Sequence, residues 1–194
     1  MTTIPFKQAV IALVGAAFFW TATTFGSTLL SLDLEKLTQD SDRIVVGRVL
    51  DAVSFQRENR IYTLHRIQVS TAVSGGDAEG TVIEVITAGG KIGDIRQAVS
   101  GAASLDTGAE YLLFLQDRGD PVFAYVLGMS QGAYTVMHEK GASNATVHPS
   151  SNPPRLVSRD KDTGRLVDVA PWLTEGKSLR DVLDRISKIL RGSK

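Results

Sequence analysis

The chain of 194 residues contains no cysteine. Disulfide bonds, thiolate metal ligands and a cysteine nucleophile are therefore excluded. The fold must be held together by its apolar core alone. A chain of this length can bury enough apolar surface to be stable without covalent cross-links.

Charge of either sign is not in excess, because 21 Lys and Arg residues balance 21 Asp and Glu residues. No overall field draws the protein to a polyanion, so nucleic acid is not expected as a partner. Histidine is scarce as well, and His65, His138 and His148 lack the short spacing of metal ligands. We therefore expect no metal and no cofactor.

Long apolar runs are absent except at the start, where residues 9–20 follow Lys7. A charged residue, a short apolar run and then small residues are the layout of a secretory signal peptide, which we place at residues 1–26. The alternative is a retained membrane anchor, but a spanning helix needs about 20 consecutive apolar residues and threonines dilute this run after Trp20. The sequence therefore predicts a secreted or periplasmic protein that meets a membrane only through an uncleaved signal.

Alternating apolar residues predict several strands. The longest candidates are residues 44–54 and 61–69, joined by the polar turn 57–60, and such a hairpin needs further strands to bury its apolar face. Residues 81–87, 111–116, 122–127 and 131–137 are the further strand candidates. We expect one core that contains Ile44, Val46, Ile67, Val85, Leu113 and Phe114.

Two helices are predicted at the ends of the folded part. Leucines between residues 29 and 37 indicate a short helix with Ser31 as its N-cap. Apolar residues at helical spacing between 179 and 190, with Ser178 and Asp181 in a capping arrangement, indicate an amphipathic helix at the C-terminus. Residues 139–154 have the composition of a loop, and residues 155–169 could form a small hairpin.

Residues 128–132, GMSQG, match the G-x-S-x-G pattern around a hydrolase nucleophile, which makes Ser130 a candidate. That mechanism needs a helix directly after the serine and then an acid and a histidine in order. The residues that follow Gly132 favour a strand instead, and no alternation of strands and helices is present. We interpret Gly128 and Gly132 as turn residues and keep a secreted serine hydrolase as the alternative function.

A second glycine-rich stretch contains Gly89, Gly90, Lys91 and Gly93. Closely spaced glycines can cradle an anion with their backbone amides, and Lys91 would add a positive charge. The other interpretation is a turn with positive φ angles, which the missing strand-turn-helix unit of a dinucleotide site favours.

The order of these elements resembles the netrin-like module, the OB-type barrel of tissue inhibitors of metalloproteinases. Residues 41–46, SDRIVV, and 108–113, GAEYLL, carry the resemblance, which covers residues 30–128. The chain is also similar to small exported bacterial proteins without an assigned activity. The inhibitors reach the protease zinc with a disulfide-bonded N-terminal cysteine that this chain lacks, so protease inhibition is implied by shape alone.

The resemblance implies a mainly β fold, a five- to six-stranded OB-like antiparallel barrel with a short N-terminal helix and a C-terminal amphipathic helix. We divide the chain into a signal peptide (1–26), a barrel (27–138), a loop or linker (139–176) and a C-terminal helix packed on the barrel (177–192).

The function we expect is that of an exported, non-enzymatic binding module for a protein or another extracytoplasmic ligand, with association with a protease as one form of it. An envelope structural protein is a further alternative. We expect no catalytic residues, and the residues expected at an interaction rim are Gly89, Gly90, Lys91, Gly93, Ser130, Gln131 and Gly132.

Overall fold

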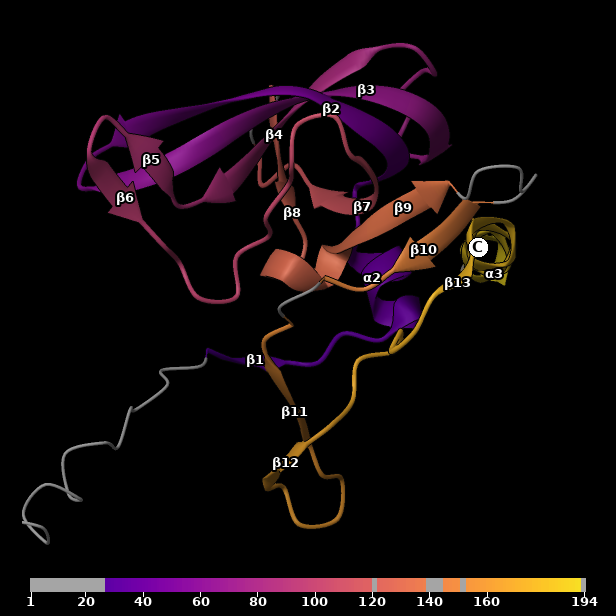
Figure 1. The fold of residues 1–194 in the computed structure, drawn as a ribbon. Coiled ribbons are helices and arrows are strands. Elements are labelled where there is room, and N and C mark those ends of the chain that lie inside the picture. The colour runs from indigo at the N-terminus through magenta and orange to yellow at the C-terminus, as the bar shows by residue number, and fades with distance from the viewer. Residues whose placement is uncertain (1–26, 120–121, 139–144, 151–152, 193–194) are drawn as a thin grey trace, which may run out of the picture.

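The computed structural model describes residues 27–119, 122–138, 145–150 and 153–192, so the expected signal peptide lies outside the described residues. The fold is mainly β, with two α-helices among the described residues (Figure 1). The helices are α2 (Leu34–Asp40) and α3 (Leu179–Gly192), with the short 3-10 helix η1 (Met129–Gly132). The strands are β1 (Thr28–Leu30), β2 (Arg43–Arg57), β3 (Arg60–Ser74), β4 (Val82–Ala88), β5 (Gly90–Ile92), β6 (Ile95–Gln97), β7 (Glu110–Gln116), β8 (Phe123–Val126), β9 (Ala133–His138), β10 (Ala145–His148), β11 (Arg155–Arg159), β12 (Leu166–Asp168) and β13 (Lys177–Ser178).

The main sheet has the strand order β13-β10-β9-β7-β2-β3-β4-β8, and β8 also pairs with β7. The pairings among β7, β2, β3, β4 and β8 therefore return to their starting strand. A ring with an odd number of strands cannot be antiparallel throughout, and here the β4–β8 pair is parallel. A separate three-stranded sheet, with the order β1-β11-β12, holds a second parallel pair, β1 with β11. The expected mainly β fold is confirmed, but the expectation that the strands of the barrel are antiparallel was wrong for the β4–β8 pair.

The long β2–β3 hairpin is present as predicted, with Arg57 opposite Arg60 at its tip. The expected single core, however, is divided into two clusters. Ile67, Val85 and Leu113 belong to the first cluster, whereas Ile44, Val46 and Phe114 belong to the second. Successive side chains of a strand point to opposite faces, so an apolar run that is covered on both faces must divide its residues between two cores.

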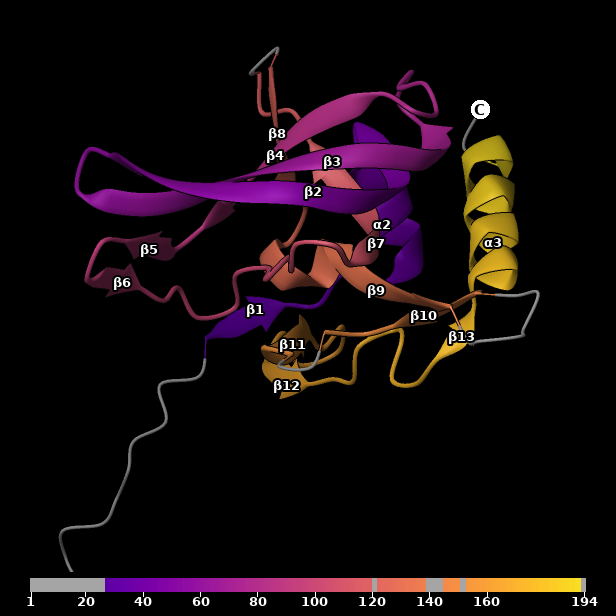
Figure 2. The ribbon, with the colours of Figure 1, turned by 45° about the horizontal axis from the view of Figure 1, so that its top comes forward.

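Helices α2 and α3 cover the second cluster (Figure 2). Leu34 and Leu37 of α2, with Val182 and Ile186 of α3, are buried there. The predicted N-terminal helix starts later than expected, because Asp33 rather than Ser31 caps it, and its carboxylate accepts a bond of 2.7 Å from the Lys36 amide. Neither helix of the described residues has the length and apolarity that a bilayer crossing requires.

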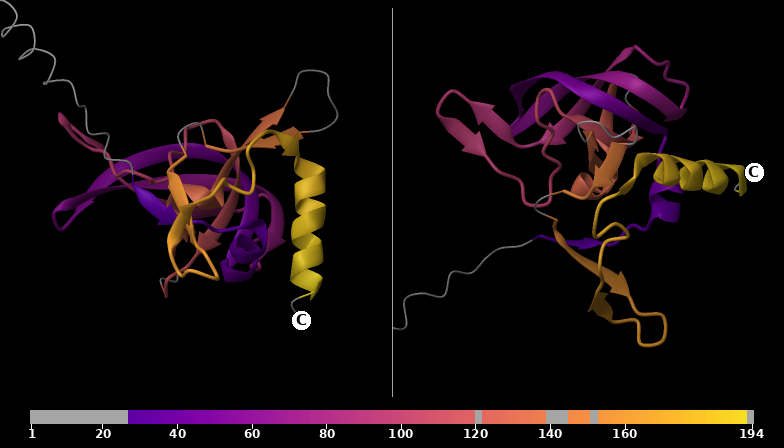
Figure 3. Two further views of the ribbon diagram at one scale, coloured as in Figure 1. Left: turned by 90° about the horizontal axis from the view of Figure 1, so that it is seen from below. Right: turned by 45° about the vertical axis from the view of Figure 1, so that its right-hand side comes forward.

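The segment expected to be a loop between residues 139 and 154 contains strand β10, which pairs with β9 and with β13. Strands β11 and β12 form the expected small hairpin. Together with β1 they make a three-stranded sheet on the side of the molecule opposite the β2–β3 hairpin (Figures 1 and 3). β10 was missed because only four residues form it and Val147 alone is fully buried.

Candidate functional site

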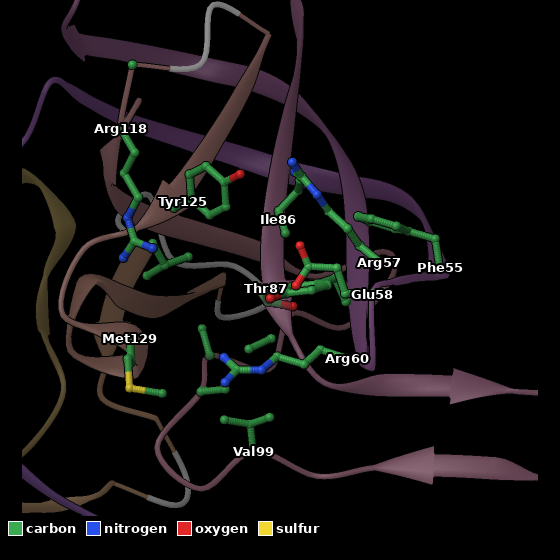
Figure 4. Close-up of a pocket in the computed structure, with 16 residues that line it drawn as sticks. Phe55, Arg57, Glu58, Arg60, Ile86, Thr87, Val99, Arg118, Tyr125 and Met129 are labelled. Atoms are coloured by element: carbon green, nitrogen blue, oxygen red, sulfur yellow. The ribbon is translucent and has the colours of Figure 1, made fainter.

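A hollow of about 860 Å³ lies beside the tip of the β2–β3 hairpin (Figure 4). We call it the arginine hollow. Five parts of the chain line it: the hairpin tip, the end of β4, residues 99–103, the β7–β8 connection with β8, and η1. Its lining residues are Phe55, Arg57, Glu58, Arg60, Tyr62, Ile86, Thr87, Ala88, Val99, Ala102, Ala103, Arg118, Gly119, Tyr125, Val126 and Met129.

Three arginines and one glutamate give the arginine hollow an excess of positive charge. Arg57 and Arg60 extend from the hairpin, and Arg118 enters from the opposite side (Figure 4). Within the described residues, none of these three guanidinium groups makes an ion pair. Two exposed arginines elsewhere are paired, Arg66 with Asp51 and Arg155 with Asp168. The hollow thus presents cationic donors that no described carboxylate neutralises.

The backbone around the arginine hollow is unusual. Glu58, Arg118 and Met129 have φ angles of 54°, 49° and 64°, and no other described residue except glycine has a positive φ. All three line the hollow. A positive φ is uncommon for a residue with a Cβ and costs of the order of 1 kcal/mol or more, and such residues cluster at functional sites. Three separate turns with a positive φ residue therefore meet at the arginine hollow.

Aromatic side chains form two walls of the hollow. The Arg118 guanidinium lies over the Tyr125 ring, with its carbon 4.9 Å from the ring centroid. Phe55 and Tyr62 face each other across β2 and β3, and their rings stack at a centroid distance of 5.9 Å. Flat apolar surface and cationic donors therefore share one cavity.

Thr87 connects the hollow to the buried His65. The Thr87 hydroxyl lies 2.9 Å from His65 Nε2, while His65 Nδ1 is buried and has no hydrogen-bond partner among the described atoms. Burial lowers the pKa of His65 to about 4, and the charge of Asp106 opposes this shift only in part. His65 is therefore neutral at neutral pH.

The other two histidines lie at separate places. His138 Nε2 and the Ser70 hydroxyl each lie 2.5 Å from the Glu110 carboxylate. Burial alone would raise the pKa of Glu110, but these two hydrogen bonds outweigh it and hold the pKa below its ordinary value. His148 Nε2 instead contacts the Thr146 hydroxyl at 2.8 Å. In the described ranges, no group of three or more potential metal ligands comes together.

Ser130 is not arranged as a hydrolase nucleophile. It lies in η1, which has four residues and leads directly into β9, so no long helix follows it. Its hydroxyl is buried and has no described hydrogen-bond partner, and both later histidines bond to other residues. Gly128 has the positive φ expected of a turn residue, at 63°. Gly132 does not have a positive φ. A side chain is excluded there for steric reasons, because a Cβ would lie 2.5 Å from the Leu127 carbonyl oxygen.

The residues expected at an interaction rim are divided by the structure. Gly90 and Lys91 belong to β5, and Gly89 and Gly93 flank that strand; Gly89, Gly90 and Gly93 all have positive φ. None of these four lines the arginine hollow.

The η1 part of the expected rim is buried. Ser130 and Gln131 are only 5% and 8% exposed, and Gly132 is buried as well. The Gln131 side chain bonds to the Leu32 amide and the Leu30 carbonyl, so it attaches the N-terminal strand. Buried side chains with such partners offer little surface to a ligand.

The sequence pattern did not indicate the arginine hollow. Residues 57–60 were expected to form a polar turn, and residues 117–121 lie between two predicted strands, yet they supply Arg57, Arg60 and Arg118. One signal was available, because Phe55 and Tyr62 flank the two hairpin arginines at alternate positions of the strands. Comparison of the chain with protein-family models, with curated proteins and with solved structures finds no match.

Proposed function

We propose that this protein is an exported, non-enzymatic binding module and that the arginine hollow is its ligand site. The observation that carries the proposal is the convergence in one cavity of the three non-glycine residues with positive φ and of three arginines without a described ion pair. Strained turns destabilise an isolated fold, and such strain is typical of functional sites. Three arginines gathered at one cavity would attract an anion.

The fold we propose is an OB-type barrel, related in shape to the netrin-like module. The closed ring of β7, β2, β3, β4 and β8, with one parallel pair, supports it. OB-type barrels have five strands and hold their ligands between the loop that joins the first two strands and the loop that joins the last two. In this ring those connections are the β2–β3 tip and the β7–β8 turn, which contribute Arg57, Arg60 and Arg118 to the hollow.

A binding role also fits the chemistry of the hollow better than catalysis does. The cavity offers donors and aromatic surface, but the described residues that line it include no histidine, no serine and a single carboxylate, Glu58. A nucleophile with an adjacent base is therefore not assembled there. The buried Ser130 hydroxyl lacks a described base as well.

Ligand capture tests the proposal. The mature protein is incubated with an extract of the compartment into which the source organism exports it, and co-purifying species are identified by mass spectrometry. Ala102→Trp places a large ring in the lining of the hollow, so we expect it to abolish capture. The control is Ala98→Trp, at an exposed position that does not line the hollow. Equal capture by both variants would place the site elsewhere, and capture of nothing by the unaltered protein would contradict a binding role.

A further inference from the structure

We propose that the ligand of the arginine hollow is a small organic anion, with a carboxylate or phosphate group attached to a flat ring. This inference rests on the proposed function, since it names the ligand class of the same site. The anionic group would lie between Arg60 and Arg118, and the ring would lie against Tyr125.

The size of the cavity favours a small molecule. Cavities of about 300–1,000 Å³ hold ligands of drug-like size, whereas a protein partner covers a broad and flatter surface. The arginine hollow, at about 860 Å³, falls within the small-molecule range. A folded partner protein is therefore not required to fill it.

The arginines select for an anion. Arg60 and Arg118 extend into the hollow from opposite sides (Figure 4), and neither has an ion-pair partner among the described residues. Like charges that face one cavity repel each other, and a carboxylate or phosphate removes that repulsion. The planar guanidinium also matches these two anions, because it can donate two parallel hydrogen bonds to their oxygens.

The Arg118–Tyr125 contact prepares one of these donors. The guanidinium lies over the Tyr125 ring. This stacking occupies the face of the guanidinium and leaves its N–H groups in the plane, where no described residue accepts a hydrogen bond from them. An arginine held in one orientation loses less conformational freedom when it binds an anion.

The apolar part of the lining selects for a ring. The side chains of Tyr125, Tyr62 and Phe55 are aromatic, and Ile86, Val99 and Met129 add aliphatic surface. An inorganic anion would leave this surface in water. A neutral aromatic compound would leave the arginines uncompensated, so the combined ligand should exceed both in affinity.

Four simple probes separate these contributions. Phenyl phosphate and benzoate carry a ring and an anion, inorganic phosphate carries only the anion, and benzyl alcohol carries only the ring. Titrations of the mature protein are followed by the chemical shifts of Tyr125 and its neighbours. We expect at least one of the two ring anions to bind about tenfold more tightly than either partial probe, since a charge-assisted hydrogen bond is worth that factor or more. The tighter of phenyl phosphate and benzoate identifies the anionic group.

Variants test the assignment to residues. Arg60→Gln and Arg118→Asn should each weaken binding of the preferred ring anion by about tenfold and leave benzyl alcohol unchanged. Asparagine suits position 118 because it tolerates a positive φ. Arg118→Lys keeps the charge without the planar fork and should have an intermediate affinity, which guards against a purely structural effect. The matched control, Arg96→Gln on β6, removes an exposed arginine outside the hollow.

Several outcomes would overturn the inference. The inference is wrong if benzyl alcohol or inorganic phosphate binds as tightly as the ring anions. It is also wrong if none of the four probes binds, or if Arg96→Gln weakens binding as much as Arg118→Asn does. If a single-stranded oligonucleotide bound over a hundredfold more tightly than phenyl phosphate, the hollow would be a nucleic-acid site rather than a site for a small anion. If capture is lost in Ala102→Trp while the probes show no preference for charge, the ligand class is wrong and the proposed function stands.

Discussion

His65 couples the stability of the fold to pH. Its ordinary pKa is 6.5, and burial lowers it to about 4 in the folded state. Between these two values the unfolded chain binds a proton that the folded protein does not, so stability falls as the pH falls from 6.5 to 4. We expect His65 to account for a loss of as much as about 3 kcal/mol across this window.

Urea unfolding at a series of pH values checks this expectation. His65→Gln is the comparison variant, because glutamine can still bond to the Thr87 hydroxyl but does not titrate. Its unfolding free energy should change less than that of the unaltered protein between pH 6.5 and 4. Parallel pH dependences would show that His65 is not the group responsible.

Substitution should affect the stability of the fold at Gly132 but hardly at Ser130. A Cβ at Gly132 would lie 2.5 Å from the Leu127 carbonyl oxygen and 2.9 Å from that of Phe114, both rigid backbone atoms. Gly132→Val should therefore destabilise by more than about 1 kcal/mol. Ser130→Ala removes a buried hydroxyl without a described partner and should change stability by less than about 0.5 kcal/mol.

A fluorophosphonate probe tests whether the Ser130 hydroxyl is an activated nucleophile. We expect no labelling of Ser130, because no described base contacts its hydroxyl. Stoichiometric labelling that disappears in Ser130→Ala would instead establish the serine hydrolase.

Strand β7 contributes side chains to both cores. Tyr111, Leu113 and Leu115 pack into the first cluster, and Leu112 and Phe114 pack into the second. Leu113→Ala should cost about 2–5 kcal/mol, because the buried side chain would leave a cavity. Leu166→Ala is the matched control on β12, where the leucine is 57% exposed, and should cost less than about 0.5 kcal/mol. Denaturant melts measure the unfolding free energy of both variants. A loss in Leu113→Ala as small as that expected for Leu166→Ala would place Leu113 outside the cores.

The elements themselves were largely predictable where local pattern determines them. Strands β2, β3, β4 and β7 and helix α3 follow from apolar periodicity, which sets the face that a residue buries. The start of α2 could not be predicted from local pattern, because serine and aspartate are both good N-cap residues and Ser31 and Asp33 were both available. Ser31 instead takes part in strand pairing, because its backbone amide donates to the Val157 carbonyl oxygen and extends the β1–β11 pairing.

At the scale of the whole molecule, the N-terminal 26 residues should be absent from the mature protein. The prediction depends on the charged start and the short apolar run of the sequence. Sequencing the N-terminus of the protein recovered from the source should find a start near Ser27. Recovery of the chain with Met1 in the membrane fraction would show that the segment is retained as an anchor.

Composition and periodicity, read from the sequence, determined that the protein is rich in β structure, free of disulfides and equipped with an amphipathic C-terminal helix. These properties are local, because each depends on residue types and on spacings of two to four residues. Only the tertiary structure decided that β8 pairs with both β4 and β7. Only that arrangement brings Arg118 to the same hollow as Arg57 and Arg60, which lie some sixty residues earlier in the chain. A binding site made of polar turn residues has no period of its own, so its members look like ordinary turns until the packing of the strands places them together.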